Sequence, residues 1–276
     1  MVSEEEQRAA RAKVITALGV FALVLVVVIA GLIWASSTTS SSAGSDPTVG
    51  AGGESAAPAP PVGAAPAAGG WDTAGQAALA ARPMRQFPDS ASLPQTLATT
   101  SLPVIAVPTA TRANPAGVGE GFPPTVEGAI GQLAALEVVG LKDLNPDTYN
   151  AAYASVSLPG APAPGATPLG YQVARNYDQI VGSGTTTITS RWQLAGAQVK
   201  GVTDGGRAAV VCVSGQLQAA AQNTVQVATG DCQAMRFTGT DWRIAPVPPA
   251  ARAPITWPGT DAFNQAGYHP TDGGPT

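Results

Sequence analysis

The sequence has 276 residues, of which only 12% are charged, and its formal net charge is −4 at pH 7. From Trp71 onward it holds 11 basic and 13 acidic residues, and this near balance argues against direct nucleic-acid binding, which needs a basic excess. Glycine and proline number 32 and 25, so much of the chain buries too little apolar surface to form a packed core. The length suits one membrane segment and one domain.

An uncharged run of 21 residues from Val14 to Trp34 predicts a transmembrane helix. At ~1.5 Å per residue it would span ~30 Å, the hydrocarbon thickness of a bilayer. Val14 begins this predicted membrane anchor, Phe21 lies within it, and Trp34 takes the place of an interfacial aromatic residue. A cleaved signal peptide is the alternative, but its apolar core would be shorter.

Basic residues near the run predict its orientation. Three of them lie within residues 1–13, whereas the next one after the run is Arg82. We therefore expect a cytoplasmic stub at 1–13, a single span of the cytoplasmic membrane at 14–34, and an extracytoplasmic C-terminal domain.

Two segments poor in regular structure follow the run. Residues 35–70 are rich in Ser and Gly and then in Ala and Pro, a composition that predicts a low-complexity linker. Residues 71–123 scatter single apolar residues among prolines, which exclude a long regular element. We expect a short helix at 76–82 and otherwise an extended strap over the domain; a partly disordered continuation of the linker is the alternative.

Three helices are predicted in the first half of a domain at 124–246. Thr125 is a suitable N-cap for a helix that ends near Gly140. Pro146 suits the first turn of a second helix. A third, short helix is expected at 169–181, after a loop rich in Pro and Gly.

Beyond Gly184 the hydrophobic pattern alternates, which predicts strands. The second strand is apolar on both faces and therefore central, and Gly230–Asp231 suggests a bulge or bend in the third. The four expected strands lie at 185–199, 208–217, 224–237 and 241–245. The order of elements predicts an α+β domain with about three helices on one face of a curved antiparallel sheet of about four strands.

Residues 247–276 are expected to form a C-terminal tail. Its aromatic residues Trp257, Phe263 and Tyr268 would dock back on the domain; a partner-binding tail is the alternative.

Cys212 and Cys232 are the only two cysteines. Both fall in the exported part, where oxidation is favoured. A turn centred near residue 221 or 222 would place them almost opposite each other, which permits a cross-strand disulfide; two buried free thiols are the alternative. A zinc site would need further ligands, and the single histidine, His269, lies near the tail.

The sequence contains no evident catalytic constellation. It has no nucleophile motif and no phosphate-binding loop, and His269 is expected to be solvated. Acidic pairs such as Glu137 with Asp143, or Asp143 with Asp147, fit helix surfaces and caps. We therefore expect no catalysis, no cofactor and no metal. Five aromatic residues either line a cavity between helices and sheet or belong to the core: Tyr149, Tyr153, Tyr171, Tyr177 and Trp192.

The plan of a stub, one membrane helix, a tether and a helices-then-sheet domain resembles the bitopic assembly factors of type IV secretion and conjugation systems. Three short stretches look like exported proteins carried on conjugative elements of actinobacteria: GFPPTVEGAI at 121–130, WPGTD at 257–261 and AGY at 266–268. The resemblance covers 14–34 and about 124–245. It implies a nuclear-transport-factor-2-like exported domain, a scaffold role, self-association, other membrane subunits as partners, and no catalysis.

Two other functions have sequence features in their favour. Accessory proteins of mammalian-cell-entry-type lipid-transport systems look similar in having one membrane helix and a comparable domain, and they would need an apolar cavity. An enzyme on the same fold would need an acid or base inside that cavity. Asp178 and Arg191 are the candidates, but neither has an identifiable partner.

Overall fold

The computed structural model describes residues 70–182, 188–220 and 224–275. The predicted stub, membrane anchor and linker at 1–69 lie outside the described residues. Among the helices that are described, none is long and apolar enough to cross a membrane.

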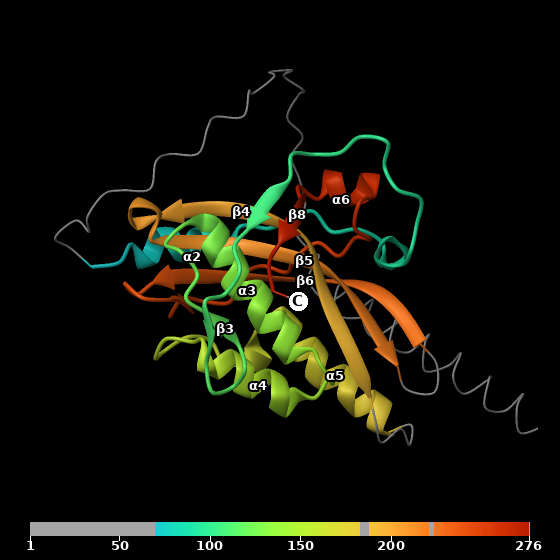
Figure 1. Ribbon diagram of the computed structural model, residues 1–276, viewed down its shortest axis with the longest axis horizontal. Coiled ribbons are helices and arrows are strands. Elements are labelled where there is room, and N and C mark those ends of the chain that lie inside the picture. The colour runs from blue at the N-terminus through green and yellow to red at the C-terminus, as the bar shows by residue number, and fades with distance from the viewer. Residues whose placement is uncertain (1–69, 183–187, 221–223, 276) are drawn as a thin grey trace, which may run out of the picture.

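The fold is α+β and is centred on a mostly antiparallel, curved sheet (Figure 1). Six strands lie in the order β1-β8-β4-β5-β6-β7. The sequence predicted four of these strands well: β4 is Thr189–Thr203, β5 is Ala208–Ala220, β6 is Thr224–Phe237 and β7 is Trp242–Ile244. Two strands were missed in this sheet, β1 (Ile105–Val107) and β8 (His269–Gly273), which pair in parallel.

The central strand β5 is buried along most of its length, as its two apolar faces predicted. The bulge considered at Gly230–Asp231 is not formed, because β5 and β6 pair in one continuous register past both residues. Gly230 packs closely against the tail instead: a Cβ there would lie 3.1 Å from the Pro254 carbonyl oxygen, where the tail crosses the strand. The register shifts lie in β4, between Leu194 and Gly196 and between Val199 and Gly201.

Local capping explains where the main helices begin. Thr125 caps α3 (Val126–Gly140) by accepting a hydrogen bond from the Gly128 N–H at 3.2 Å. Asn145 caps α4 (Pro146–Ser155), which starts with the expected proline. The remaining helices are α2 (Thr73–Ala81), α5 (Pro168–Gly182) and α6 (Asp261–Gln265), and short 3-10 turns occupy Asp89–Ser92, Pro164–Ala166 and Asp204–Gly206.

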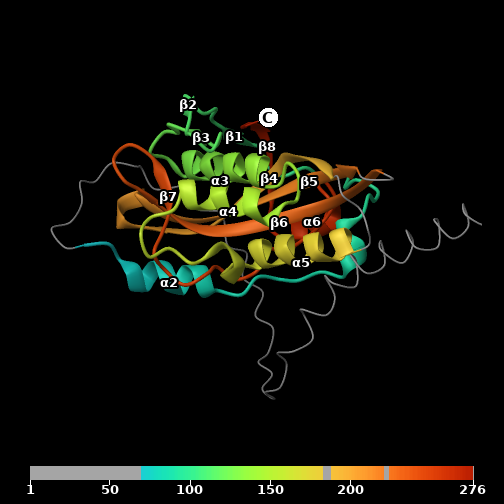
Figure 2. The ribbon, with the colours of Figure 1, turned by 90° about the horizontal axis from the view of Figure 1, so that it is seen from below.

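The sheet carries a separate hydrophobic core on each face. Helices α3, α4 and α5 contribute to the first core, which includes Val211 and Val213 of β5. The second core holds Val210 and Cys212 of the same strand, together with Ala80 of α2 and much of the chain after β7. Figure 2 shows α3 and α2 on opposite sides of the sheet.

The segments predicted as strap and tail are parts of the folded unit. The strap supplies α2, β1 and a small hairpin of β2 (Arg112–Ala113) with β3 (Gly119–Glu120). In the tail, Phe263 and Tyr268 are fully buried, and β8 enters the sheet between β1 and β4. The predicted domain at 124–246 is therefore too narrow, because both flanking segments complete its sheet.

Two contacts fasten the strap where the chain enters the fold. The guanidinium groups of Arg207 and Arg236 both pack on the Trp71 ring, at 4.7 and 4.9 Å from the ring centre. Lys200 of β4 donates from Nζ to the carbonyl oxygens of Ala80 and Arg82, at 2.8 and 2.7 Å. Lys200 thus caps the C-terminus of α2, where a cation is favoured.

The disulfide prediction is confirmed. Cys212 and Cys232 are direct cross-strand partners and are joined by an S–S bond of 2.02 Å. The Met84 sulfur of the strap lies 3.6 Å from each of their sulfur atoms, so the bond is sealed inside the second core.

Replacing both cysteines with alanine is expected to lower the free energy of unfolding by ~3 kcal/mol at most, because the bond closes a loop of 20 residues in the unfolded chain. Urea unfolding with and without reductant measures this. Reductant should lower the wild-type midpoint to that of the variant and leave the variant unchanged. Equal midpoints for oxidised wild type and variant would contradict the expectation.

Candidate functional site

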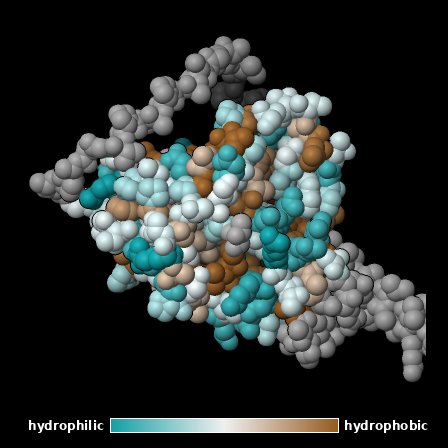
Figure 3. All heavy atoms as spheres, viewed as in Figure 1, coloured by the Kyte–Doolittle hydropathy of each residue, from teal (hydrophilic) through white to brown (hydrophobic). Residues whose placement is uncertain are grey.

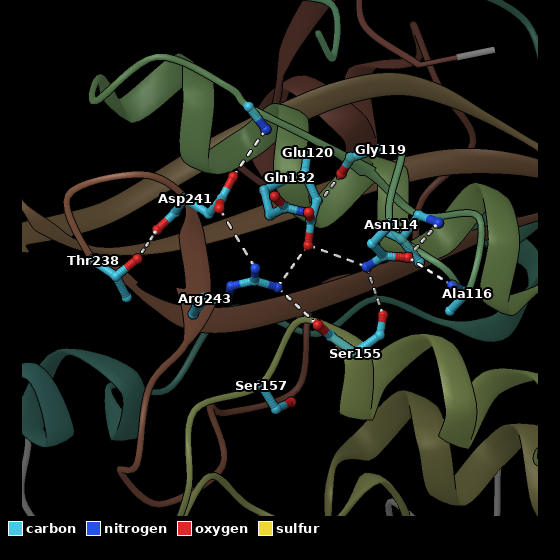
Figure 4. A network of polar contacts seen from close by, with 12 residues as sticks. Asn114, Ala116, Gly119, Glu120, Gln132, Ser155, Ser157, Thr238, Asp241 and Arg243 are labelled. Carbon is cyan, nitrogen blue, oxygen red and sulfur yellow. Dashed lines mark hydrogen bonds and ion pairs between the residues drawn. The ribbon is translucent and has the colours of Figure 1, made fainter. Parts of the chain in front are cut away.

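A network of charged side chains joins the β2–β3 hairpin to the region of β7 (Figure 4). Arg243 pairs with Glu120 at 2.7 Å, and Arg112 contacts both carboxylate oxygens of Asp241 at 2.6 Å. Both acidic side chains are buried, whereas half of the Arg112 side chain is exposed. Two carboxylates and two guanidinium groups balance each other, so the cluster has no spare charge for a ligand.

Asn114 orders the hairpin within this network. Its side-chain oxygen accepts from the N–H groups of Ala116 and Val118, at 3.0 and 3.1 Å. Its amide nitrogen donates to Glu120 and to the Ser155 hydroxyl at the end of α4. The network therefore holds an irregular segment of the strap against the domain, which is a structural task.

A second polar cluster lies inside the first core, between α3 and β6. Glu137 of α3 and Asp231 of β6 are 1% and 2% exposed. Burial, and then the negative charge of Asp231, raise the pKa of Glu137 well above its ordinary value. Burial also raises the pKa of Asp231 to about 6, although hydrogen bonds from Gln233 and the Cys232 backbone oppose that shift.

Two tyrosines of α4 lie close to the carboxyl pair. Tyr149 and Tyr153 are each 1% exposed, and their rings lie 6.1 Å apart. Burial raises the pKa of both phenols, and the negative charges of Glu137 and Asp231 raise it further. Both hydroxyl groups therefore stay protonated at any physiological pH.

The five aromatic residues predicted to share a cavity do not all come together. Tyr149, Tyr153 and Trp192 belong to the first core, and the Trp192 indole donates to the Thr229 hydroxyl at 2.8 Å. Tyr171 is 50% exposed on α5, so its assignment to a cavity is wrong. Tyr177, on the same helix, is half-buried.

The acidic residues show what the sequence reasoning missed. Glu137 was assigned to a helix surface, yet it is buried, because it lies four residues after Leu133 on the face of α3 that packs in the first core. Asp143 does act near a helix start, as predicted, by accepting from the Asn145 N–H and the Thr148 hydroxyl. His269 is partly exposed and does not lie in a loose tail; it begins β8, with Nδ1 3.0 Å from the Pro103 carbonyl oxygen.

Within the described ranges, no group of three or more His, Cys, Asp or Glu side chains is arranged to hold a metal ion. No protein-family model, curated protein or solved structure matches the chain, so no relative assigns a role to these residues. The site with unusual chemistry is the enclosed carboxyl pair.

Replacing Asp241 with asparagine is expected to cost about 1–3 kcal/mol of unfolding free energy, the range for losing hydrogen bonds to a charged group. The change weakens the contacts with Arg112 and with the Gly121 N–H. Urea unfolding measures the loss. Asp272→Asn is the matched control, because Asp272 is exposed on β8. Equal losses in both variants would show that the network contributes nothing specific.

Proposed function

We propose that the chain is a non-catalytic, single-pass membrane scaffold subunit of a type IV secretion or conjugative transfer machine. Its exported domain, of the nuclear-transport-factor-2-like fold, would mediate assembly with other membrane subunits and with further copies of itself. The observation that carries the proposal is the combination of a 21-residue apolar run at 14–34 with a helices-then-sheet domain.

The order and packing of the elements support the fold assignment. Helices α3, α4 and α5 precede the three long strands β4, β5 and β6 and contribute to one core with them. This arrangement of helices on one face of a curved antiparallel sheet is the one that the resemblance implies. The added β1 and β8 widen the sheet without changing that order.

The firm attachment of the chain at its entry also favours a scaffold. Residues 35–70 are predicted to be a linker, and directly after them the Trp71 ring packs against the guanidinium groups of Arg207 and Arg236. From there, α2 is tied to the sheet by Gln76, which donates to the Met235 carbonyl oxygen at 3.0 Å and accepts from Arg236. A subunit held at a membrane by a tether needs such an anchorage.

The interior of the domain favours this proposal over the two alternatives. A lipid-binding accessory protein would need an apolar cavity, but two carboxyl groups lie between the helices and the sheet. An enzyme would need reacting groups that a substrate can reach, and the carboxyl pair is enclosed. Asp178 and Arg191, the residues considered for catalysis, are exposed on α5 and β4.

Figure 3 adds information about the surface available to partners. Hydrophobic and hydrophilic residues are interspersed on the face it shows. Five large apolar side chains are substantially exposed among the described residues: Leu93, Leu97, Val104, Tyr171 and Val199. Leu93, Leu97 and Val104 belong to one stretch of the strap before β1, whereas Tyr171 lies on α5 and Val199 on β4, which suits several modest contacts within a multi-subunit assembly.

Cross-linking in intact membranes, with a tag at the C-terminus and mass spectrometry of the recovered proteins, tests the proposal. We expect recovery of secretion-type ATPases, polytopic channel subunits and cross-linked copies of the chain. The control is residues 70–276 exported behind a cleavable signal, which should lose most of these partners because the membrane tether is gone. Recovery of lipid-transport permeases, or of no partner at all, would contradict the proposal.

A further inference from the structure

Glu137 and Asp231 face each other in the most enclosed part of the molecule. Their carboxyl groups lie within hydrogen-bonding reach of each other. Neither Glu137 oxygen meets a hydrogen-bond donor elsewhere in the described residues, and the same holds for Oδ1 of Asp231. Two ionised carboxylates in this position would repel each other without water to screen the charge.

The distribution of donors shows which group carries a proton. Oδ2 of Asp231 accepts from the Gln233 side chain at 2.8 Å, and the Cys232 backbone N–H also hydrogen-bonds to this carboxylate. Neither carboxyl oxygen of Glu137 accepts a hydrogen bond from a described residue. The pair is satisfied only when Glu137 holds the proton and donates it to Asp231, because a protonated carboxyl is both donor and acceptor.

The groups around the pair supply no compensating positive charge. Tyr149 and Tyr153 face it from α4, and Tyr268 approaches Asp231 from the other side of β6. The Tyr153 hydroxyl is buried and has no hydrogen-bond partner. None of the groups that act electrostatically on either carboxyl, among the residues described, is a lysine, an arginine or a histidine.

We propose that Glu137 and Asp231 form a buried proton-binding site that couples the attachment of the α3–α4 helical layer on the sheet to pH. With the proton bound, one hydrogen bond joins α3 to β6. When the proton is lost, that bond is replaced by charge repulsion in a region without water, and the helical layer is loosened. This inference does not depend on the scaffold proposal.

The direction of the pH effect follows from linkage. Both acids have folded-state pKa values above their ordinary ones, so the folded chain binds more protons than the unfolded chain above pH ~4. The contribution of the pair is therefore complete only below about pH 4, and it declines as the pH rises from there through about 6, the pKa of Asp231. It declines further wherever Glu137 ionises.

Thermal unfolding of the full-length chain in detergent, between pH 4.5 and 7.5, tests this. The measured quantity is the Tm of Glu137→Gln minus the Tm of the wild type. This difference should be larger at pH 7.5 than at pH 4.5, by on the order of 5 °C, because glutamine imitates the protonated acid and cannot ionise. Glu127→Gln is the matched control, since Glu127 is exposed on the same helix. The pKa of Lys200, lowered by burial to about 8, places its titration mainly above this window.

Infrared spectroscopy of the wild type provides a second readout that does not require a stable variant. The C=O stretch of a protonated, buried carboxyl should be present at neutral pH and disappear in Glu137→Gln but persist in Glu127→Gln. Parallel Tm curves for wild type and Glu137→Gln would overturn the proposal. So would the absence of that stretch at neutral pH in the wild type.

Discussion

The structure depends on one constraint, which is that β5 must be covered on both faces. Its residues from Ala208 to Gly215 are all buried. Because successive side chains point to opposite faces, neither face of the sheet can be open to solvent here. Helices α3, α4 and α5 serve only one face. The second face must be covered by something else, and the chain uses the two segments that have the least regular sequence, namely α2 with the strap and the stretch after β7.

This constraint explains which features the sequence could predict. The helix starts at Thr125 and Pro146 depend on residues next to each other, and the pairing of Cys212 with Cys232 depends on a single turn. By contrast, β1 has three residues and β8 five, too few for a readable period. The two strands pair with each other although they are far apart in the sequence, with Ile105 opposite Thr271, so only the assembled fold brings them together.

Glu137 shows the same limit within the candidate site. Glu137 follows Val126, Ile130 and Leu133 at helical spacing, so the pattern itself places it on the apolar face of α3. A charged residue is normally assigned to the surface, and nothing in the sequence around it indicates Asp231 as its neighbour. A Cβ on Gly131 would lie 2.7 Å from the Phe122 ring, which means that the strap packs directly against the second side of the helix. With both sides covered, only Val138 and Val139 in its C-terminal half remain partly exposed.

Retaining a carboxyl pair in this core is costly, since apolar residues of similar volume often make a protein as stable or more so. The position of the pair relative to the disulfide follows from the alternation of side chains along β6. Successive residues of β6 point to opposite faces, so Asp231 faces the helices while Cys232 is bonded to Cys212 in the second core. The disulfide and the strap fix the position of β6 from one side, and the proton site acts on α3 from the other. A change in protonation therefore falls on the helical layer, because the strand beneath it is covalently held.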